Sequence, residues 1–436
     1  MSAKHKYCIV TAFMIAVLLF TESCGLFTGE PTLSINAEYT SGEPRIENSN
    51  GIISLIEPTG NGAIENYSIK LGGWKYKGNI AYRSYIQDVG WQGWKPGGEV
   101  SGTTGEGRTV CGVQIMLTGH IANYYDISYR VNLQSSGWQE WVSNGTVSGG
   151  EPVIGIEIKL EAKSGDVRDT EWTITEYSDD SGNQAMFYTM HNNEDGTLIV
   201  IDGGYDANTE QVRSVINLFG GKVDYWFLTH YDEDHAAAFN SIYANPQGIE
   251  IGEVYCTPLD YDYYLECAAD RWWDVPWVYE QFLNQTAGDE SINYLARGDV
   301  FEIDGLKIEV FNSYDQLVVD TGSADVANYG SLLFKITGNE DTFLVCGDVY
   351  GDLWIRLAEL YGEQLQAKYV QLGHHGNNHV NPEEWAVVNA EVAFFDGPAW
   401  LTESDEYSAK ALIEWCEANG IVAYTFATAP NSFGFE

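Results

Sequence analysis

The chain contains few histidines, and most of them lie directly after apolar runs. Five of the eight histidines fall in two short segments, HYDEDH at His230–His235 and HHGNNH at His374–His379. The first segment follows the run DYWFL (Asp224–Leu228), and the second follows YVQL (Tyr369–Leu372). Short apolar runs with polar boundaries are typical of buried β-strands. Because the loop after a buried strand can aim several side chains at one point, the pattern predicts one composite site built on a sheet.

From about Thr170 onward, strand patterns alternate with a helical pattern. The run TLIVIDGG (Thr197–Gly204) predicts a buried strand followed by a glycine turn, and the spacing of apolar residues between 212 and 218 predicts a helix after it. A second apolar strand then ends at His230. Alternating strands and helices are typical of an α/β layered domain, so we predict one over residues 170–436.

The segment after this second strand carries four potential metal ligands. They are His230, Asp232, Asp234 and His235. Imidazole and carboxylate groups are ligands for Zn²⁺ and Mn²⁺. An acidic, solvated turn would explain the aspartates, but it would not explain the histidines that flank them after a core strand.

Three further segments offer groups of the same chemistry. FLVCGDVYGD (Phe343–Asp352) is typical of an apolar strand that ends in Gly-Asp, which places Asp348 as a carboxylate able to bridge two ions. YVQLGHHG (Tyr369–Gly376) is typical of another apolar strand, one that is followed by His374 and His375. Asp202, in the IDGG turn, is placed to orient a ligand or the loop from behind.

Taken in order, the DGG turn, H-x-D-x-D-H, G-D and H-H-G resemble the metallo-β-lactamase superfamily across residues 170–436. The resemblance implies a four-layer αββα sandwich and metal-dependent hydrolysis. The common superfamily motif has His where this chain has Asp232. That variant, with NYGSLLFKI (Asn328–Ile336) before the Gly-Asp, looks most like the soluble domain of bacterial competence DNA-uptake proteins and their exported relatives. Because one fold hosts many reactions, no substrate is implied.

The resemblance also implies a set of metal ligands. One ion would be held by His230 and Asp232, and the other by Asp234, His235 and either His374 or His375, with Asp348 bridging them. The superfamily has a further His before the bridging Asp, and this chain has none in that region, where Asn328 and Ser331 stand instead. The first ion is therefore expected to be weakly held or absent. Oxygen donors in place of two histidines favour Mn²⁺, with Zn²⁺ left open, and we expect one or two ions.

The same resemblance implies how such a site would act. A pair of divalent ions lowers the pKa of a shared water molecule and supplies hydroxide near neutral pH, which would attack a phosphorus or carbonyl centre. We expect Asp234 to be essential to this chemistry. His379 is either a proton donor to the leaving group or an exposed loop residue.

Two aromatic segments lie outside these motifs. The insertion Asp260–Phe282 is rich in Tyr and Trp. It forms either a wall or lid over the metals or a segment that packs on its own domain. Trp400, in GPAWL, is expected in the core.

The first half of the chain contains an internal repeat with a period of about 46 residues. GWQGW (Gly90–Trp94) aligns with GWQEW (Gly137–Trp141), and GVQIML (Gly112–Leu117) aligns with GIEIKL (Gly155–Leu160) after a short deletion. Alternating apolar residues punctuated by glycine predict short strands. We therefore predict an all-β repeat module over residues 61–163, with two copies and a partial one. A linker or degenerate repeat is expected over residues 25–60.

The G-W core and the stretch SGTTGEG (Ser101–Gly107) resemble the clostridial hydrophobic tryptophan-repeat family. The resemblance implies a surface protein whose repeats attach to a cell-wall or other surface polymer. Four tryptophans mark the two copies: Trp91, Trp94, Trp138 and Trp141. They either fill the repeat core or form a stacking platform for sugar or peptide, because exposed aromatic rings bind flat apolar faces.

The N-terminal residues 1–24 have the pattern of an export signal. Two lysines precede an apolar run of about 14 residues, Tyr7–Phe20, which is too short to span a bilayer comfortably. The sequence TESCG resembles a bacterial lipoprotein box with Cys24 as the lipidation site, although Glu22 departs from that pattern. We expect an exported protein at the cell surface or secreted, with membrane attachment through a lipidated Cys24 and an uncleaved anchor as alternatives to release.

The formal net charge of −41 limits the partners of the chain. A surface this acidic repels polyanions and anionic membranes, so stable nucleic-acid binding is not expected. Three functions stay open. They are hydrolysis of a phosphodiester in a cell-surface polymer or extracellular nucleic acid, hydrolysis of a lactone, β-lactam or thioester at the same metals, and surface adhesion with a degenerate metal domain. The competence-like motifs favour the first, and Asp232 with the missing His disfavours a true β-lactamase.

Overall fold

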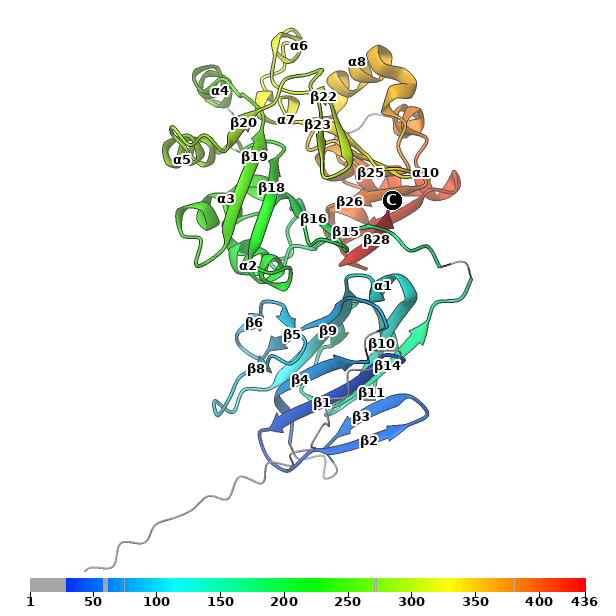
Figure 1. The fold of residues 1–436 in the computed structure, drawn as a ribbon. Helices are drawn as coiled ribbons and strands as arrows, with labels where there is room; N and C mark the ends of the chain where they lie inside the picture. The colour runs from blue at the N-terminus through cyan, green and yellow to red at the C-terminus, as the bar shows by residue number, and fades with distance from the viewer. Residues whose placement is uncertain are drawn as a thin grey trace, which may run out of the picture.

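The computed structural model describes residues 29–57, 62–73, 75–165, 167–269, 271, 273–378 and 381–436. It consists of an all-β module, which ends at residue 162, and an α/β domain, which begins at residue 172 and lies against the module (Figure 1). The predicted export signal, including Cys24, lies outside the described residues. Among the helices that the structure describes, none is both long enough and apolar enough to cross a membrane.

The N-terminal module is built from three antiparallel strand pairs. They are β1 (Thr32–Tyr39) with β4 (Ile64–Gly72), β5 (Asn79–Ile86) with β9 (Val110–Thr118), and β10 (Tyr125–Leu133) with β14 (Val153–Ala162). The same register recurs in each pair, where Ile35 opposes Ile69, Tyr82 opposes Ile115 and Tyr129 opposes Ile158. All six side chains lie in one apolar core. Each copy of the sequence repeat therefore corresponds to one strand pair.

Short strands join the three pairs into a ring. β8 (Ser101–Gly102) pairs with β4, β13 (Ser148–Gly149) with β9, and β3 (Ile52–Ile56) with β14. Residues 32–72 thus form a complete first unit although they lack the GWQ core, because pairing needs only alternating apolar residues. The remaining elements of the module are β2 (Arg45–Ser49), β6 (Gly90–Trp91), β7 (Lys95–Pro96), β11 (Gly137–Trp138), β12 (Val142–Ser143) and α1 (Ile121–Tyr124).

The C-terminal domain contains two seven-stranded sheets. The first has the order β20 (Ile292–Tyr294), β19 (Glu250–Cys256), β18 (Lys222–Leu228), β17 (Leu198–Asp202), β16 (Phe187–Asn192), β15 (Trp172–Glu176) and β28 (Asn431–Phe435). The second has the order β21 (Val300–Ile303), β22 (Leu306–Asn312), β23 (Leu333–Thr337), β24 (Thr342–Val345), β25 (Tyr369–Gln371), β26 (Val392–Phe395) and β27 (Val422–Thr425). The run from β17 to β20 and the run from β24 to β27 are parallel.

Helices cover the outer faces of both sheets. The longer ones are α2 (Thr209–Leu218), α3 (Glu233–Ala244), α4 (Tyr261–Ala268), α5 (Pro276–Gln285), α8 (Gly351–Tyr361) and α10 (Ser408–Ala418). The short ones are α6 (Gln316–Val319), α7 (Val326–Tyr329), α9 (Ala399–Thr402), η1 (Asp206–Asn208), η2 (Gly362–Leu365), η3 (Gly373–Gly376) and η4 (Pro382–Val388). One apolar core lies between the sheets, a second lies under α2, α3 and α5, and a third lies under α8 and α10. The predicted αββα sandwich is confirmed.

The parallel strands show why the site forms where it does. All five residues of β17, LIVID, are buried, as expected for a parallel strand that is covered on both faces. The polar residue of β17, Asp202, is the last residue of the strand. His230, Asp348 and His375 likewise follow the carboxyl ends of β18, β24 and β25. The ends of these strands therefore bring together polar side chains that their buried interiors could not hold.

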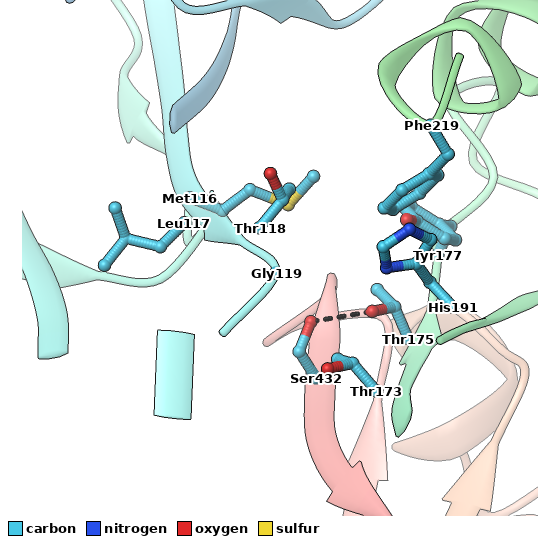
Figure 2. Close-up of a pocket in the computed structure, with 10 residues that line it drawn as sticks. All are labelled: Met116, Leu117, Thr118, Gly119, Thr173, Thr175, Tyr177, His191, Phe219 and Ser432. Carbon is cyan, nitrogen blue, oxygen red and sulfur yellow. Dashed lines mark hydrogen bonds between the residues drawn. The ribbon is translucent and has the colours of Figure 1, made fainter. Parts of the chain in front are cut away.

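The two domains share a buried interface. Trp94 and Met116 of the repeat module belong to the same apolar core as Val212 and Val215 of α2. Figure 2 shows the end of β9 facing His191 and Phe219 across a cavity of about 10 Å³. This is room for about one water molecule, so the space is a packing gap and not a substrate site.

Polar contacts add to this interface. Arg83 of β5 forms an ion pair with Asp180 of the C-terminal domain at 2.6 Å. The Trp94 backbone N–H donates to Ser214 Oγ at 2.9 Å, and Lys77 Nζ lies 3.1 Å from Glu194 Oε2. The first GWQ copy is thus attached to the C-terminal domain through its own residues Arg83 and Trp94.

Candidate metal centre

The His230–His235 segment forms the turn between β18 and α3. His230 follows the strand after one residue, Asp232 is the residue that precedes the first turn of α3, and Asp234 and His235 lie in that turn. Negative side chains are favourable at a helix N-terminus because the backbone N–H groups there point outward. The strand and the helix together hold all four predicted ligands close to one another.

Four side chains from three segments converge beside this turn: Asp234, His235, Asp348 and His375. His375 Nε2 lies 3.2 Å from Asp234 Oδ2 and 3.6 Å from Asp348 Oδ2. His235 Nε2 lies 3.2 Å from Asp348 Oδ1 and 3.8 Å from Asp234 Oδ1. Ligands about 2.1 Å from a tetrahedral ion are about 3.4 Å from one another. Asp234, His235 and His375 therefore have the spacing of one metal site, and Asp348 lies beside both histidines.

His230 and Asp232 extend this cluster. His230 Nε2 lies 3.6 Å from Asp232 Oδ2. His230, His235 and Asp348 each offer one ligand atom, and these atoms lie within 4.8 Å of one another. Asp234, His235 and His375 form a second group that meets the same criterion, so the two groups share His235.

Several ligand atoms are buried without a well-aligned hydrogen bond to any described residue. They are His230 Nε2, Asp232 Oδ1, His235 Nε2, Asp348 Oδ1 and His375 Nε2. An unsatisfied buried polar group costs about 1–3 kcal/mol, so a convergent set of them is costly for the protein alone. A divalent cation would satisfy nitrogen and carboxylate groups at once. The residues present therefore fit a metal.

Mutual charge shifts the pKa of these groups. Burial alone would raise the pKa of Asp348, but His235 and His375 hold it well below its ordinary value, and the same balance lowers the pKa of Asp234 to about 2. Burial alone would lower the pKa of His235 and of His375, but Asp348 and Asp234 raise both. This balance favours the ionised carboxylates and the protonated imidazoles, and a bound cation would compete with the imidazole protons.

Asp202 acts from behind the ligands, as the sequence predicts. Its Oδ2 lies 2.8 Å from His235 Nδ1, and its two oxygens accept hydrogen bonds from the Thr229 backbone N–H at 2.7 Å and the Thr229 hydroxyl at 2.6 Å. Because Nδ1 of His235 donates to Asp202, Nε2 is the nitrogen that faces the cluster. Asp202 therefore sets both the ring orientation and the tautomer of His235.

The two residues expected in place of the missing His have different surroundings. Ser331 is buried, and its Oγ accepts a hydrogen bond from the Asp348 backbone N–H at 3.1 Å. Asn328 lies in the cleft wall, and its Nδ2 donates to Asp325 Oδ2 at 3.3 Å. Ser331 supports the loop that carries Asp348.

The structure distinguishes the two adjacent histidines. His375 is buried within the cluster, whereas His374 Nε2 is 4.0 Å from Asp348 Oδ2 and its ring packs against Tyr350. His374 Nδ1 lies 3.2 Å from Asn378 Nδ2. His375 is thus the better placed ligand, and His374 lies at the edge of the site. His379, the expected proton donor, lies outside the described residues.

A cleft of about 650 Å³ opens above the cluster. Asp232, Asp234, Asp348 and both adjacent histidines line it. The insertion Asp260–Phe282 forms α4 and α5 and lines the same cleft through Arg271, Trp273 and Val275, while α5 packs on α3. The insertion is therefore both a wall of the cleft and part of its own domain's core.

Several residues of this cleft carried no motif in the sequence. Arg271 Nε lies 2.7 Å from Asp274 Oδ2, and its Nη2 lies 2.6 Å from Asp325 Oδ1. Trp400 was expected in the core, and this is wrong, because its side chain is 43% exposed and lines the cleft. The four-residue helix α9 holds it at the rim.

Asp396 is a further carboxylate beside the site. It follows β26, accepts hydrogen bonds from the Tyr188 hydroxyl and from Gln371 Nε2, and is fully buried. Burial raises its pKa to about 6. The signal that could have found it is the pattern VAFFD, an apolar strand that ends in Asp like the strand before Asp348.

The tryptophans of the repeats form two matching stacks. The Arg83 guanidinium lies 4.8 Å from the Trp91 ring and 4.8 Å from the Trp94 ring. Arg130 lies 5.0 Å and 4.9 Å from the Trp138 and Trp141 rings. Trp94 is 2% exposed in the domain interface, so its ring has no free face for a polymer. Trp91, Trp138 and Trp141 are half-buried.

Comparisons with known families agree with this arrangement. A model of the family "Clostridial hydrophobic W" matches residues 85–119, and a model of the "Metallo-beta-lactamase superfamily" matches residues 183–352. The C-terminal domain has the metallo-β-lactamase fold. The matched part of the metallo-β-lactamase domain includes the His230–His235 segment and Asp348. No curated protein matches the chain by sequence.

Solved structures of the same fold are similar to the metallo-β-lactamase domain at low identity. The metallo-β-lactamase fold protein YhfI from Bacillus subtilis is 13% identical, with 60% of this chain and 99% of YhfI covered and a TM-score of 0.38. Zn²⁺-bound PqqB from Methylobacterium extorquens is 12% identical, with 61% and 100% covered and a TM-score of 0.36. The diiron β-hydroxylase CmlA from Streptomyces venezuelae is 10% identical, with a TM-score of 0.38. The match covers 63% of this chain and spans about half of CmlA, 55%.

Proposed function

We propose that this protein is an exported, metal-dependent phosphodiesterase that acts on a cell-surface polymer. One observation carries the proposal. Asp234, His235, Asp348 and His375 converge at a cleft that Asp234, Asp348 and His375 line, and His235, Asp348 and His375 each have a buried ligand atom without a hydrogen-bond partner. The variant motif with Asp232 favours a phosphodiester over a β-lactam, because it is the form that resembles the competence-type domains.

The chain's own residues would hold and orient the reacting groups. Asp234, His235, His375 and Asp348 form the fuller ligand set, with His230 and Asp232 for a second ion. A bound Zn²⁺ or Mn²⁺ would supply hydroxide near neutral pH and stabilise negative charge on the phosphate oxygens. Asp202 keeps His235 in the orientation that this requires.

The overall reaction consumes one water molecule. The water oxygen forms a new P–O bond, and the P–O bond to the leaving alcohol breaks. One water proton remains on the phosphomonoester, and the other ends on the alcohol.

The test is hydrolysis of bis-p-nitrophenyl phosphate by the full chain, stripped of metal and reloaded with Mn²⁺ or Zn²⁺. Asp234→Ala should reduce the rate at least about 100-fold, because it removes a ligand and not merely a group behind one. Asp405→Ala is the control, since Asp405 has an 89% exposed side chain that pairs with Lys410. Equal rates for the Asp234 variant and the wild type would reject the site.

The same preparations separate the other two candidate functions. Nitrocefin and a panel of lactones and thioesters report hydrolysis of carbonyl substrates by the same residues. Metal analysis after equilibrium dialysis reports whether the site binds an ion at all. A chain that binds no ion and hydrolyses nothing would favour surface adhesion through the repeats.

Attachment to a surface polymer belongs to the same proposal. Trp138 and Trp141 would provide it, because the corresponding stack in the first copy is used in the domain interface. Co-sedimentation of the full chain with insoluble cell-wall polymer should be lost when both are replaced by Ala. Unchanged sedimentation would reject this role.

A further inference from the structure

Two exposed tryptophans lie in the cleft beside the ligand cluster. The side chain of Trp273 is 51% exposed and that of Trp400 is 43% exposed, and both line the cleft. Each indole ring presents a large apolar face on which a ligand can pack. What distinguishes these two from other exposed tryptophans is their place in the cleft beside the ligand cluster.

Both rings are held in place by their neighbours. Trp400 Nε1 donates to the Gly182 carbonyl at 2.9 Å, and its ring meets Tyr407 edge to face at 5.5 Å. The Arg271 guanidinium lies 4.9 Å from the Trp273 ring, and Asp274 and Asp325 fix that guanidinium. Rings that are oriented before binding lose little conformational entropy when a ligand packs on them.

The charge of the cleft limits what can lie on these rings. Five carboxylates line it, namely Asp232, Glu233, Asp234, Asp325 and Asp348. Arg271 is the one Lys or Arg side chain among the described residues that line it, and two carboxylates already balance its charge. Bound cations would offset the ligand carboxylates but not Glu233, while Asp325 and Asp274 together exceed the single charge of Arg271. A polynucleotide would bring a further negative charge with every residue, which this cleft repels.

Uncharged amides are a further group of polar side chains in the cleft. They are Asn183, Gln184, Asn328, Asn377 and Asn378, and the hydroxyls of Tyr205, Tyr350 and Tyr407 lie there as well. Each amide can both donate and accept hydrogen bonds. A pyranose ring matches this combination, because its C–H face packs on an aromatic ring and the hydroxyls at its rim pair with amides.

We propose that the scissile phosphodiester is flanked by an uncharged sugar that packs on Trp273 and Trp400, so that the substrate is a phosphodiester-linked glycan and not a polynucleotide. This inference rests on the proposed hydrolase function and names the substrate of that site. The bound cations would neutralise the single negative charge of the scissile phosphodiester. The groups on either side of it carry none.

The test uses three diesters that share one leaving group. They are methyl p-nitrophenyl phosphate, glucosyl p-nitrophenyl phosphate and thymidine 5′-p-nitrophenyl phosphate. Wild-type kcat/KM should be at least about tenfold higher for the glucosyl than for the methyl compound, since about 1.4 kcal/mol of binding corresponds to tenfold. Trp273→Ala and Trp400→Ala should each bring that ratio close to one, mainly through KM.

The control is Trp277→Ala, which should keep the ratio. Trp277 lies in the same insertion and is 47% exposed, but it lines a different part of the surface. A ratio near one in the wild type, or a ratio that survives both cleft variants, would overturn the inference. A preference for the thymidine compound, or faster cleavage of a DNA oligonucleotide, would overturn it in favour of nucleotides. If no probe is hydrolysed faster than by Asp234→Ala, the proposed function itself fails.

Sugar binding gives a second readout that does not depend on hydrolysis. Calorimetric titration of the full chain with neutral glucose and N-acetylglucosamine oligosaccharides should show binding in the wild type and in Trp277→Ala. The affinity should fall at least about tenfold in Trp273→Ala and Trp400→Ala. An affinity that these two variants leave intact would place the sugar site elsewhere, on the repeats, and would overturn the inference.

Discussion

At the scale of single residues, Asp202 shows how a group that cannot itself reach the ion can control the site. Its carboxylate faces His235 Nδ1 at 2.8 Å and accepts two hydrogen bonds from Thr229. It has a positive φ of 53°, a conformation that a strand end rarely adopts. The strand therefore turns sharply at this residue and leaves the carboxylate under His235.

We predict that Asp202→Asn lowers metal affinity by about 10- to 100-fold, because the amide has a single acceptor oxygen and cannot accept from both the Thr229 N–H and His235 Nδ1 as the two carboxylate oxygens do. Competition with a chromophoric chelator measures this affinity. Asp224→Asn is the matched control, since Asp224 also accepts a backbone N–H, from Leu198, at the opposite end of the same strands. Equal losses in the two variants would show that the effect comes from a weakened sheet.

We also predict that metal affinity rises with pH. The raised pKa values of His235 and His375 favour the protonated imidazoles in the metal-free protein, and a bound cation must compete with those protons. The charged imidazoles stabilise the metal-free fold below their pKa, and this stabilisation is lost as the pH rises through it. Chelator competition between about pH 6 and about pH 8 should show tighter binding at the higher pH. A flat profile would mean that the imidazoles are neutral throughout.

At the scale of elements, the turn η3 is the most constrained piece of the site. Three successive residues, His374, His375 and Gly376, have positive φ values of 53°, 56° and 81°. Such conformations cost about 1–3 kcal/mol each for a residue with a side chain. A Cβ on Gly376 would lie 2.4 Å from the Phe395 ring. The glycine of the H-H-G motif thus permits the turn that aims His375.

We predict that Gly376→Ala reduces thermal stability and removes the high-affinity metal site, because the clash with Phe395 displaces His375. Gly362→Ala is the control, since Gly362 also has a positive φ, of 50°, but its Cβ would meet no atom within 4 Å. It should lose stability through the backbone alone, because its φ of 50° and ψ of −124° are a conformation that suits glycine and strains other residues, and it should keep its metal. Calorimetry and metal analysis of both variants separate the two effects.

The sequence indicated those parts of the site that follow strands and missed those that do not. His230, Asp348 and His375 were predictable because residues after the parallel strands of a layered fold lie at one edge. Arg271 was not, since it lies in a loop of an insertion with no periodicity to place it. Trp400 stands in an apolar segment, and local sequence does not reveal that its helix ends at the rim of the cleft.

At the scale of the whole molecule, the two copies of the GWQ repeat have different surroundings. Arg83 pairs with the neutral Gln114 at 2.7 Å, which leaves its charge for Asp180 of the metallo-β-lactamase domain. At the equivalent position in the other copy, Arg130 pairs with Glu157 at 2.7 Å within its own unit. The first copy thus has Gln114 where the second copy has Glu157, and it is the first copy whose Arg–Trp stack contacts the other domain.

We predict that Arg83→Ala loosens the two domains, whereas Arg130→Ala does not. Arg83 contributes a nearly buried, charged hydrogen bond across the interface, worth about 2 kcal/mol, while Arg130 contributes only within the repeat module. Limited proteolysis of the segment between β14 and β15, compared at equal temperature, should be faster in Arg83→Ala than in the wild type. Arg130→Ala provides the matched change in charge and stacking. If both variants are cleaved at the wild-type rate, the apolar core around Trp94 alone holds the domains together. If both are cleaved faster, the repeat module itself has been weakened, and the proposed difference in role between the two Arg–Trp stacks is wrong.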